Sequence, residues 1–158
     1  VGDTLYEGKP KVTFPGLPSF APAHFAVARP KDLGRAKQFR KGVDQLESEG
    51  VVQILRSDRR GEGVPIFAAV GPMQFEVASH RLDVEFGVGV ELERLPYRTV
   101  RRLTDSEHRK TIEASRRGEV LTRSDGAELA LFADEIALGT LRRQHPDLAV
   151  EHLVAGTD

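Results

Sequence analysis

The sequence predicts an α+β fold, in which a split βαβ sheet with two helices is followed by a second small α+β subdomain. The first observation is the order of predicted elements between residues 24 and 95, which runs strand, helix, strand, strand, helix, strand. The second is the length of 158 residues, which is enough to bury a hydrophobic core without covalent cross-links. The third is a composition with no cysteine and a net charge of -1, which excludes a disulfide framework, a thiolate metal site and a uniformly basic nucleic-acid-binding surface.

The N-terminal segment is predicted to lie outside this sheet. Residues 1–14 contain two short strand-like runs, Thr4–Tyr6 and Lys11–Phe14, on either side of a turn. Between residues 14 and 22, three prolines disfavour a helix and favour an extended linker. This linker leads into the first strand of the sheet, which is predicted at His24–Ala28.

The first helix is predicted over Lys31–Glu49. Its apolar residues recur at spacings of three and four and therefore share one face: Ala36, Phe39, Val43 and Leu46. Gly50 ends this helix. Two apolar strands, Val51–Leu55 and Pro65–Val70, follow on either side of a polar turn and predict a hairpin.

The second helix begins near Pro72, a residue suited to a first helical turn. Its apolar residues Phe75, Ala78 and Leu82 align on one face, and the strand Gly89–Leu95 follows. These elements complete a ferredoxin-like subdomain over residues 15–96, with both helices packed on one face of an antiparallel sheet.

The remaining residues, 97–158, predict the second subdomain. A strand at Tyr97–Leu103 precedes a capping-box spacing, in which Thr104 caps a helix over 105–117 and Glu107 reaches back to it. A Ser-Asp-Gly turn then separates two further strands, and a helix and a closing strand end the chain. The predicted ranges are Gly118–Arg123, Leu129–Phe132, Ile136–Gln144 and Leu148–Val154.

No group of residues predicts an active site or a metal site. The run from Gly2 to Pro10 has the wrong spacing for a phosphate-binding loop and ends in proline where a hydroxyl is required to bind magnesium. The five histidines are not spaced as zinc ligands. Acyl-phosphate hydrolysis on this fold would need an asparagine to position water, as in the acylphosphatase family, and the chain contains no asparagine.

Two basic clusters are the remaining candidates for function. The first combines the predicted first helix with the hairpin that follows it: Arg35, Lys37, Arg40, Lys41, Arg56, Arg59 and Arg60. The second lies between residues 97 and 123: Arg98, Arg101, Arg102, Arg109 and Lys110, with Arg116 and Arg117 nearby. Each cluster could meet phosphate groups. The alternative is an ordinary solvated surface, on which Arg40 pairs with Asp44. Strand alternation sends Arg101 and Arg102 to opposite faces.

Aromatic residues provide a separate test, because single-stranded RNA binders on this fold stack bases on exposed rings of central strands. Phe25 and Phe67 are predicted on central strands. If these rings are exposed, they support a free-standing RNA-binding module. If they are buried, they belong to the core and that alternative fails.

Several short sequence motifs in the chain resemble those of the third domain of peptide chain release factor 3, a translational GTPase related to elongation factor G. The proline-rich linker from Phe14 to Pro22 is similar to the one by which that factor enters its third domain. The short motifs that carry this resemblance are Lys41-Gly42, Gln45-Leu46, Glu49-Gly50 with Gln53, and Val70-Gly71 with Gln74-Phe75. Residues 1–14 are similar to the last strand of the β-barrel second domain, and the sheet would be that of the elongation factor G third domain.

The resemblance implies a cytoplasmic factor of translation termination, which removes class I release factors from the ribosome and hydrolyses GTP. GTP, GDP and magnesium would bind an absent first domain, so no cofactor and no catalysis are expected in this chain. The implied partners are the small ribosomal subunit near protein S12 and neighbouring ribosomal RNA, and the factor's own GTPase and β-barrel domains. No membrane contact is expected, since no run approaches the roughly 18 apolar residues of a span. The two function hypotheses are therefore a ribosome-docking domain and a single-stranded RNA-binding module.

Overall fold

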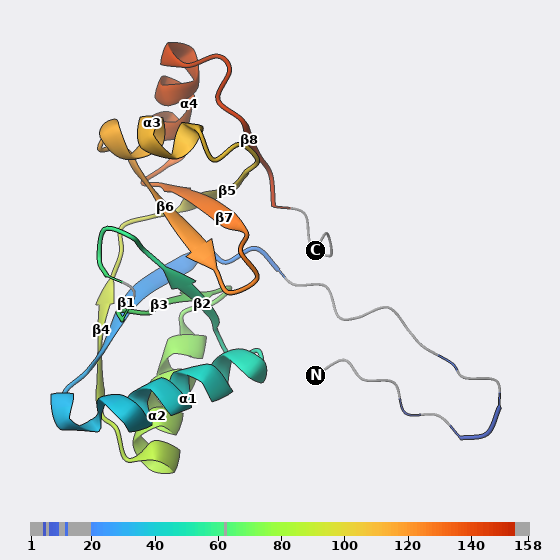
Figure 1. Cartoon of the computed structure of the whole chain (residues 1–158), viewed down its shortest axis with the longest axis vertical. Helices are drawn as coiled ribbons and strands as arrows, with labels where there is room; N and C mark the ends of the chain where they lie inside the picture. Colours follow the sequence, from blue (N-terminus) through green and yellow to red (C-terminus); the bar gives the residue numbers. More distant parts are fainter. Residues whose placement is uncertain (1–4, 6, 10–11, 13–19, 62, 154–158) are drawn as a thin grey trace.

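A computed structural model describes residues 5, 7–9, 12, 20–61 and 63–153 of the chain. These residues form four α-helices and one antiparallel sheet of eight strands in the order β4-β1-β3-β2-β6-β7-β5-β8 (Figure 1). The mixed α+β class predicted from the sequence is confirmed. Most of the predicted barrel-strand remnant at 1–14 lies outside the described residues.

The first half of the described chain has the predicted order of elements. Its elements are β1 (His24–Pro30), a 3-10 turn (Leu33–Arg35), α1 (Ala36–Ser48), β2 (Gln53–Arg56), β3 (Ile66–Ala69), α2 (Met73–Phe86) and β4 (Val90–Arg94). Strand β2 begins later than predicted because Val51 belongs to the end of α1, where its N–H donates to the carbonyl of Leu46. Gly50 makes this helix end possible with a φ of 71°.

The second half differs from the prediction mainly at its first helix and at its closing strand, which among the described residues covers only Val150–Glu151 instead of beginning at Leu148. Its elements are β5 (Thr99–Leu103), α3 (His108–Ala114), β6 (Gly118–Arg123), β7 (Glu128–Phe132), α4 (Glu135–Gln144) and β8 (Val150–Glu151). The predicted capping box is wrong, because the Thr104 hydroxyl donates to the carbonyl of Ala149 instead. Asp105 accepts the N–H of Glu107 at 2.9 Å, and this turn delays the start of α3 to His108.

Three hydrophobic cores divide the described chain into layers. Helices α1 and α2 cover one face of the β4-β1-β3-β2 half, and α3 and α4 cover the outer face of the other half (Figure 1). The middle core lies between the two halves of the sheet, which face each other: Phe25, Val27, Leu55, Ile66, Leu121, Leu129 and Leu131 are among its residues. The alternation along β1 places Phe25 and Val27 in this middle core and Ala26 and Ala28 under the helices.

The two halves are joined at a junction where β2 pairs with β6, with Leu55 opposite Arg123 and Arg56 opposite Thr122. The sheet is therefore continuous across the predicted subdomain boundary at residue 96, and the two parts share the middle core. The division into 15–96 and 97–158 stays a prediction.

The burial of the central aromatic residues contradicts the RNA-binding alternative. Phe25 is 1% exposed and Phe67 is not exposed at all. Phe67 packs under α1 and α2, whereas Phe25 faces the second half of the sheet. The face on which an RNA binder of this fold would stack bases is thus covered by strands of the same chain.

Candidate functional site

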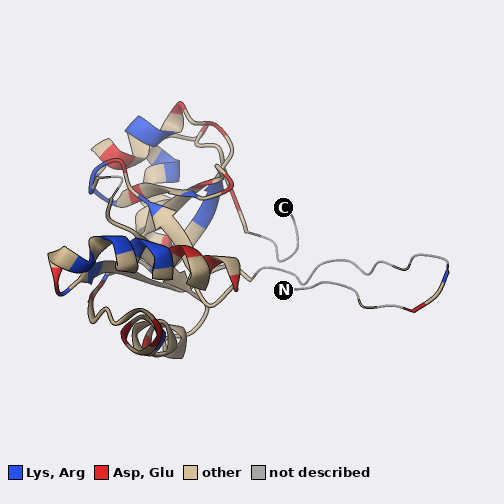
Figure 2. Ribbon diagram, turned by 60° about the horizontal axis from the view of Figure 1, so that its bottom comes forward, with Lys and Arg blue, Asp and Glu red and all other residues tan. Residues whose placement is uncertain are grey.

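The exposed face of α1 carries a row of cations. Arg40 and Lys41 lie three and four residues after Lys37, so the three side chains share one side of the helix, and Figure 2 shows a run of blue along it. All three are exposed, and their side chains have no hydrogen-bond or ion-pair partner among the described residues. The pairing of Arg40 with Asp44, which the sequence left open, does not form. We call these three residues the α1 row.

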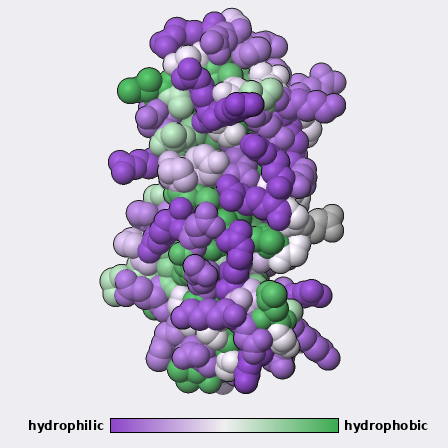
Figure 3. All heavy atoms as spheres, turned by 90° about the vertical axis from the view of Figure 1, so that its left-hand side faces the viewer, coloured by the Kyte–Doolittle hydropathy of each residue, from purple (hydrophilic) through white to green (hydrophobic). Residues whose placement is uncertain are grey.

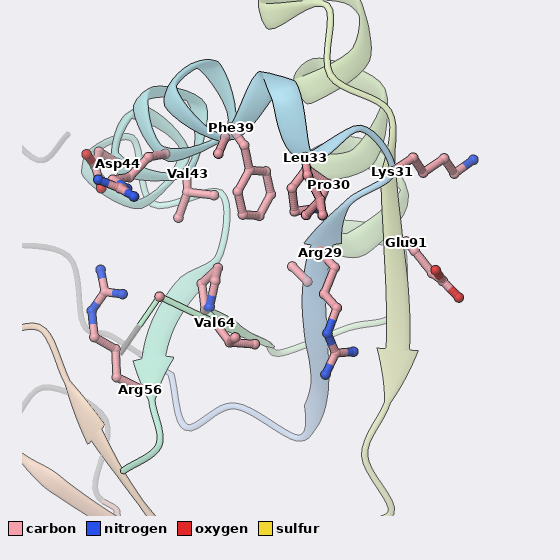
Figure 4. A pocket seen from close by; sticks show the side chains of 15 residues that line it. Arg29, Pro30, Lys31, Leu33, Phe39, Val43, Asp44, Arg56, Val64 and Glu91 are labelled. Carbon is pink, nitrogen blue, oxygen red and sulfur yellow. The ribbon is translucent and has the colours of Figure 1, made fainter. Parts of the chain in front are cut away.

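A groove of about 600 Å³ lies beside the α1 row. Figure 4 shows Phe39 and Val43 of α1 on one side of it and Val64, from the loop between β2 and β3, on the other. Arg40 and Arg56 also line the groove, so the structure brings these two predicted site residues together. The groove therefore combines apolar side chains with charged groups of both signs, because Asp44 and Glu91 line it as well.

Arg35 has a structural partner. Its guanidinium donates to the carbonyl of Gly87 at 2.7 Å and thereby ties the start of α1 to the end of α2. Gly87 adopts a φ of 65° as the C-terminal cap of α2. Any Cβ at residue 87 would lie 2.8 Å from the Arg35 Nη1 atom, so the two residues fit each other closely.

Arg60 is bound to a buried carboxylate. Its Nε and Nη2 atoms each lie 3.0 Å from an oxygen of Glu119, whose side chain is only 3% exposed. The hydroxyls of Ser57 and Tyr97 donate to the same carboxylate at 2.6 and 2.9 Å. Burial alone would raise the pKa of Glu119, but the hydrogen bonds from Arg60, Ser57 and Tyr97 outweigh it and the pKa is lowered. Burial and the bond to Glu119 raise the pKa of Tyr97 to about 12.

Arg109 of the second cluster holds the same loop from the other side. It bonds Glu128 of β7 at 2.6 Å and Asp58 of the β2–β3 loop at 2.5 Å, and it also donates to Thr122 of β6. Together with the Ser57 and Arg60 bonds to Glu119, these contacts fix the loop after β2 against the second half of the chain. Arg60 and Arg109 thus stabilise the junction.

Arg101 is buried under α4, where it donates to Glu135 at 2.6 Å. Its neighbour Arg102 is exposed, which confirms the alternation predicted for this strand. Arg98 and Lys110 are exposed as well, but Arg101 and Arg109 are paired with carboxylates, so only part of the second cluster is available as a basic surface.

The comparisons with known proteins agree with this fold. A family model described as "Class II release factor RF3, C-terminal domain" matches residues 14–142. The chain belongs to this family. It is 40% identical over 148 residues to a peptide chain release factor 3 of Symbiobacterium thermophilum, covering 94% of the chain and 28% of that protein. It is 39% identical over 150 residues to a peptide chain release factor 3 of Acaryochloris marina, covering 94% of the chain and 27% of that protein. The chain therefore spans little more than a quarter of these relatives' length.

The site residues predicted from the sequence of this release factor domain did not include Glu119, whose carboxylate is buried. Glu119 is preceded by a glycine and followed by apolar residues of β6. An acidic residue within such an apolar strand indicates that a cation is paired with it, and this pattern could have predicted the site. Tyr97 was predicted only as the start of a strand. Its role as a donor to Glu119 depends on a partner 22 residues away.

Among the described residues of the domain, no group of three or more His, Asp or Glu side chains is arranged to hold a metal ion. None of the described helices is long and apolar enough to cross a membrane. Figure 3 shows a face with mostly hydrophilic side chains and smaller hydrophobic areas between them. The described surface thus offers polar contacts and grooves as its candidates for function.

Proposed function

We propose that this chain is the part of a release factor 3 that docks the factor on the small ribosomal subunit. Family membership carries this proposal, because the match covers residues 14–142 of the chain. The α1 row supports it, since its three cations have no partner within the described chain and are available to phosphate groups. Contacts of this kind release condensed counterions from RNA and give salt-dependent affinity.

The groove beside the α1 row extends the proposal to a protein contact. Its floor of Phe39, Val43 and Val64 is apolar and would gain little from an RNA backbone. A ribosomal protein segment with an apolar side chain would bury that floor, while the α1 row meets neighbouring RNA. The ribosomal protein S12 region and adjacent ribosomal RNA are the partners we propose for this surface.

The chemistry of the full-length factor is proposed to lie outside this chain. GTP binding with magnesium, GTP hydrolysis and removal of class I release factors would belong to the remainder of the relatives, of which the chain spans 28% or less in those compared. This domain would then turn as a rigid body against the GTPase and β-barrel domains. The continuous sheet and its three cores support such rigidity.

Co-sedimentation of the chain with purified small ribosomal subunits across a salt series tests the proposal. Lys41→Gln should weaken binding about fivefold at low salt and reduce the salt slope by about one, because one phosphate contact is lost. Lys110→Gln is the matched control, since Lys110 is also an exposed helical lysine but lies on α3, away from the α1 row. If the wild-type chain does not bind the subunits, or if both variants bind as the wild type does, the proposed docking surface is wrong.

A further inference from the structure

A second cavity opens at the junction of the two halves, away from the groove beside α1. It has a volume of about 500 Å³ and lies between the β2–β3 loop, the chain before β5 and the turn after α3. Its lining residues define the junction pocket: Arg59, Arg60, Tyr97, Arg116, Gly118 and Glu119. The predicted first cluster is therefore divided, because Arg56 faces the groove and Arg59 faces the junction pocket.

Two guanidinium groups in the junction pocket are available to a ligand. The side chains of Arg59 and Arg116 are exposed and have no hydrogen-bond or ion-pair partner among the described residues. Arg60 is different, because Glu119 neutralises it. Both Glu119 oxygens are already occupied, one by Ser57 and Arg60 and the other by Arg60 and Tyr97. The pocket is thus left with an excess positive charge from Arg59 and Arg116.

The backbone of Arg116 has a conformation that is unfavourable for any residue with a Cβ. Arg116 has a φ of 55°, and it is the one residue other than glycine with a positive φ in the described chain. The position follows the C-terminal cap of α3, where glycine is usually preferred. An arginine in this conformation is less stable than a glycine would be, because its Cβ lies close to the following carbonyl oxygen. Strain of this kind is often kept where a side chain has a function.

The chemistry of the lining distinguishes this pocket from the groove beside α1. Among the described residues, no aliphatic side chain lines the junction pocket, so an apolar peptide side chain would meet only the Tyr97 ring there. Arginine forks fit the oxygens of a phosphate group, and each such bond is charge-assisted. The lining thus favours an anion with several oxygens over an apolar protein segment.

We infer that the junction pocket binds a phosphate group of an RNA backbone, with Arg59 and Arg116 as its two ligands. Arg60 and Glu119 hold the loop that carries Arg59, so they position one ligand. The identity of the RNA as ribosomal rests on the proposed function. The pocket itself is a second contact, separate from the α1 row.

The positive φ at residue 116 allows a variant that removes the phosphate ligand without destabilising the folded state. Arg116→Gly removes the guanidinium and relieves the positive φ, so the folded state should become more stable while the phosphate ligand is lost. Arg59→Gln removes the other ligand from an exposed position. Arg117→Gln is the matched control, since Arg117 is the neighbouring exposed arginine and does not line the junction pocket.

The first measurement is an NMR titration of the chain with a short RNA duplex at low ionic strength. The backbone amides of Tyr97 and Arg116 should shift on addition of the duplex. The affinity should fall about tenfold in Arg116→Gly and in Arg59→Gln, which corresponds to one charge-assisted hydrogen bond. Arg117→Gln should bind nearly as the wild type does. Absence of shifts at the pocket, or equal losses in Arg116→Gly and Arg117→Gln, would overturn the inference.

The second measurement separates this inference from the proposed function. Binding of the same variants to small ribosomal subunits is followed across a salt series, and each pocket variant should lower the salt slope by about one. If the wild-type chain binds the duplex through the pocket but not the subunits, the proposed function fails and the pocket stands. If the chain binds the subunits, and neither pocket variant changes its affinity for the subunits or for the duplex, the inference fails alone.

Discussion

Removing Arg60 should destabilise the fold through the carboxylate it leaves behind. Arg60→Met keeps most of the aliphatic stem but deletes both bonds to Glu119, each 3.0 Å long. Glu119 is 3% exposed, so in the variant its carboxylate keeps only the two hydroxyl donors and any water that enters from the junction pocket, neither of which replaces the charge of Arg60. The Ser57 and Tyr97 hydroxyls remain but carry no charge. The variant therefore isolates the contribution of one ion pair at the junction.

The size of the effect follows from burial. Breaking a fully buried ion pair by removing one partner costs about 3 to 5 kcal/mol. The Arg60 side chain is 28% exposed, so solvent screens part of the pair and we expect the lower end, about 3 kcal/mol at pH 7.

The pH dependence provides a second signature. In the wild type the pKa of Glu119 is lowered, so the pair contributes stability at neutral pH that is lost only as the pH falls through that lowered pKa. Without Arg60, burial is less well opposed and the pKa of Glu119 rises. The carboxylate of the variant then takes up a proton at a higher pH than that of the wild type. The stability difference between the two proteins should therefore shrink as the pH is lowered from 7 to 4.

Urea denaturation of the wild type and the variant across this pH range measures both quantities. Arg59→Met is the matched control, because Arg59 is the exposed neighbour without a partner in the described chain, and its stability should stay within about 0.5 kcal/mol of the wild type. A loss below about 1 kcal/mol for Arg60→Met at pH 7, or a loss that does not change with pH, would refute the reasoning.

Two further predictions concern packing and the junction. Gly42→Ala should destabilise the fold by about 1 to 3 kcal/mol in thermal unfolding, because the added Cβ would lie 2.5 Å from a methyl carbon of Leu82. Gly139→Ala in α4 is its control and should stabilise by about 0.5 to 1 kcal/mol, since a Cβ added there would meet no described atom within 4 Å. Arg109→Met should cost about 2 kcal/mol in urea denaturation, since it leaves the partly buried Glu128 without its cation. An unchanged urea midpoint for Arg109→Met, or equal effects of the two glycine variants, would contradict these expectations.

The elements of the first half could be predicted because their signals are local. Phe39, Val43 and Leu46 repeat with the period of a helix, and all three are buried against the sheet. The junction could not be predicted in this way. It depends on the pairing of Leu55 and Arg56 with a strand more than sixty residues further along the chain, and a four-residue strand carries no mark of which edge it will pair with.

The candidate site was predicted only in part, for a related reason. A sequence shows charges but not their distant partners. Arg60 and Arg109 look equivalent to Lys37 and Lys41 in the sequence, yet their carboxylate partners at 119 and 128 occupy them. The predicted surface therefore contained both available cations and structural ones, and burial was needed to separate them. In the sequence, Arg116 was only one of several basic residues, because amino-acid composition does not reveal which residue adopts a positive φ.

The junction links stability to the proposed contacts through one short loop. Arg56 lies at the start of this loop and faces the groove beside α1, whereas Arg59 faces the junction pocket. Between and beside them, Ser57, Asp58 and Arg60 are each bonded to the second half of the chain. Because the loop is fixed on both sides, the groove and the pocket keep a constant separation. The binding free energies of two contacts at a fixed separation add without a further loss of conformational freedom. Arg60→Met loosens this loop and also leaves the Glu119 carboxylate without its cation in the pocket. For both reasons it should weaken phosphate binding at the pocket even though Arg59 and Arg116 remain.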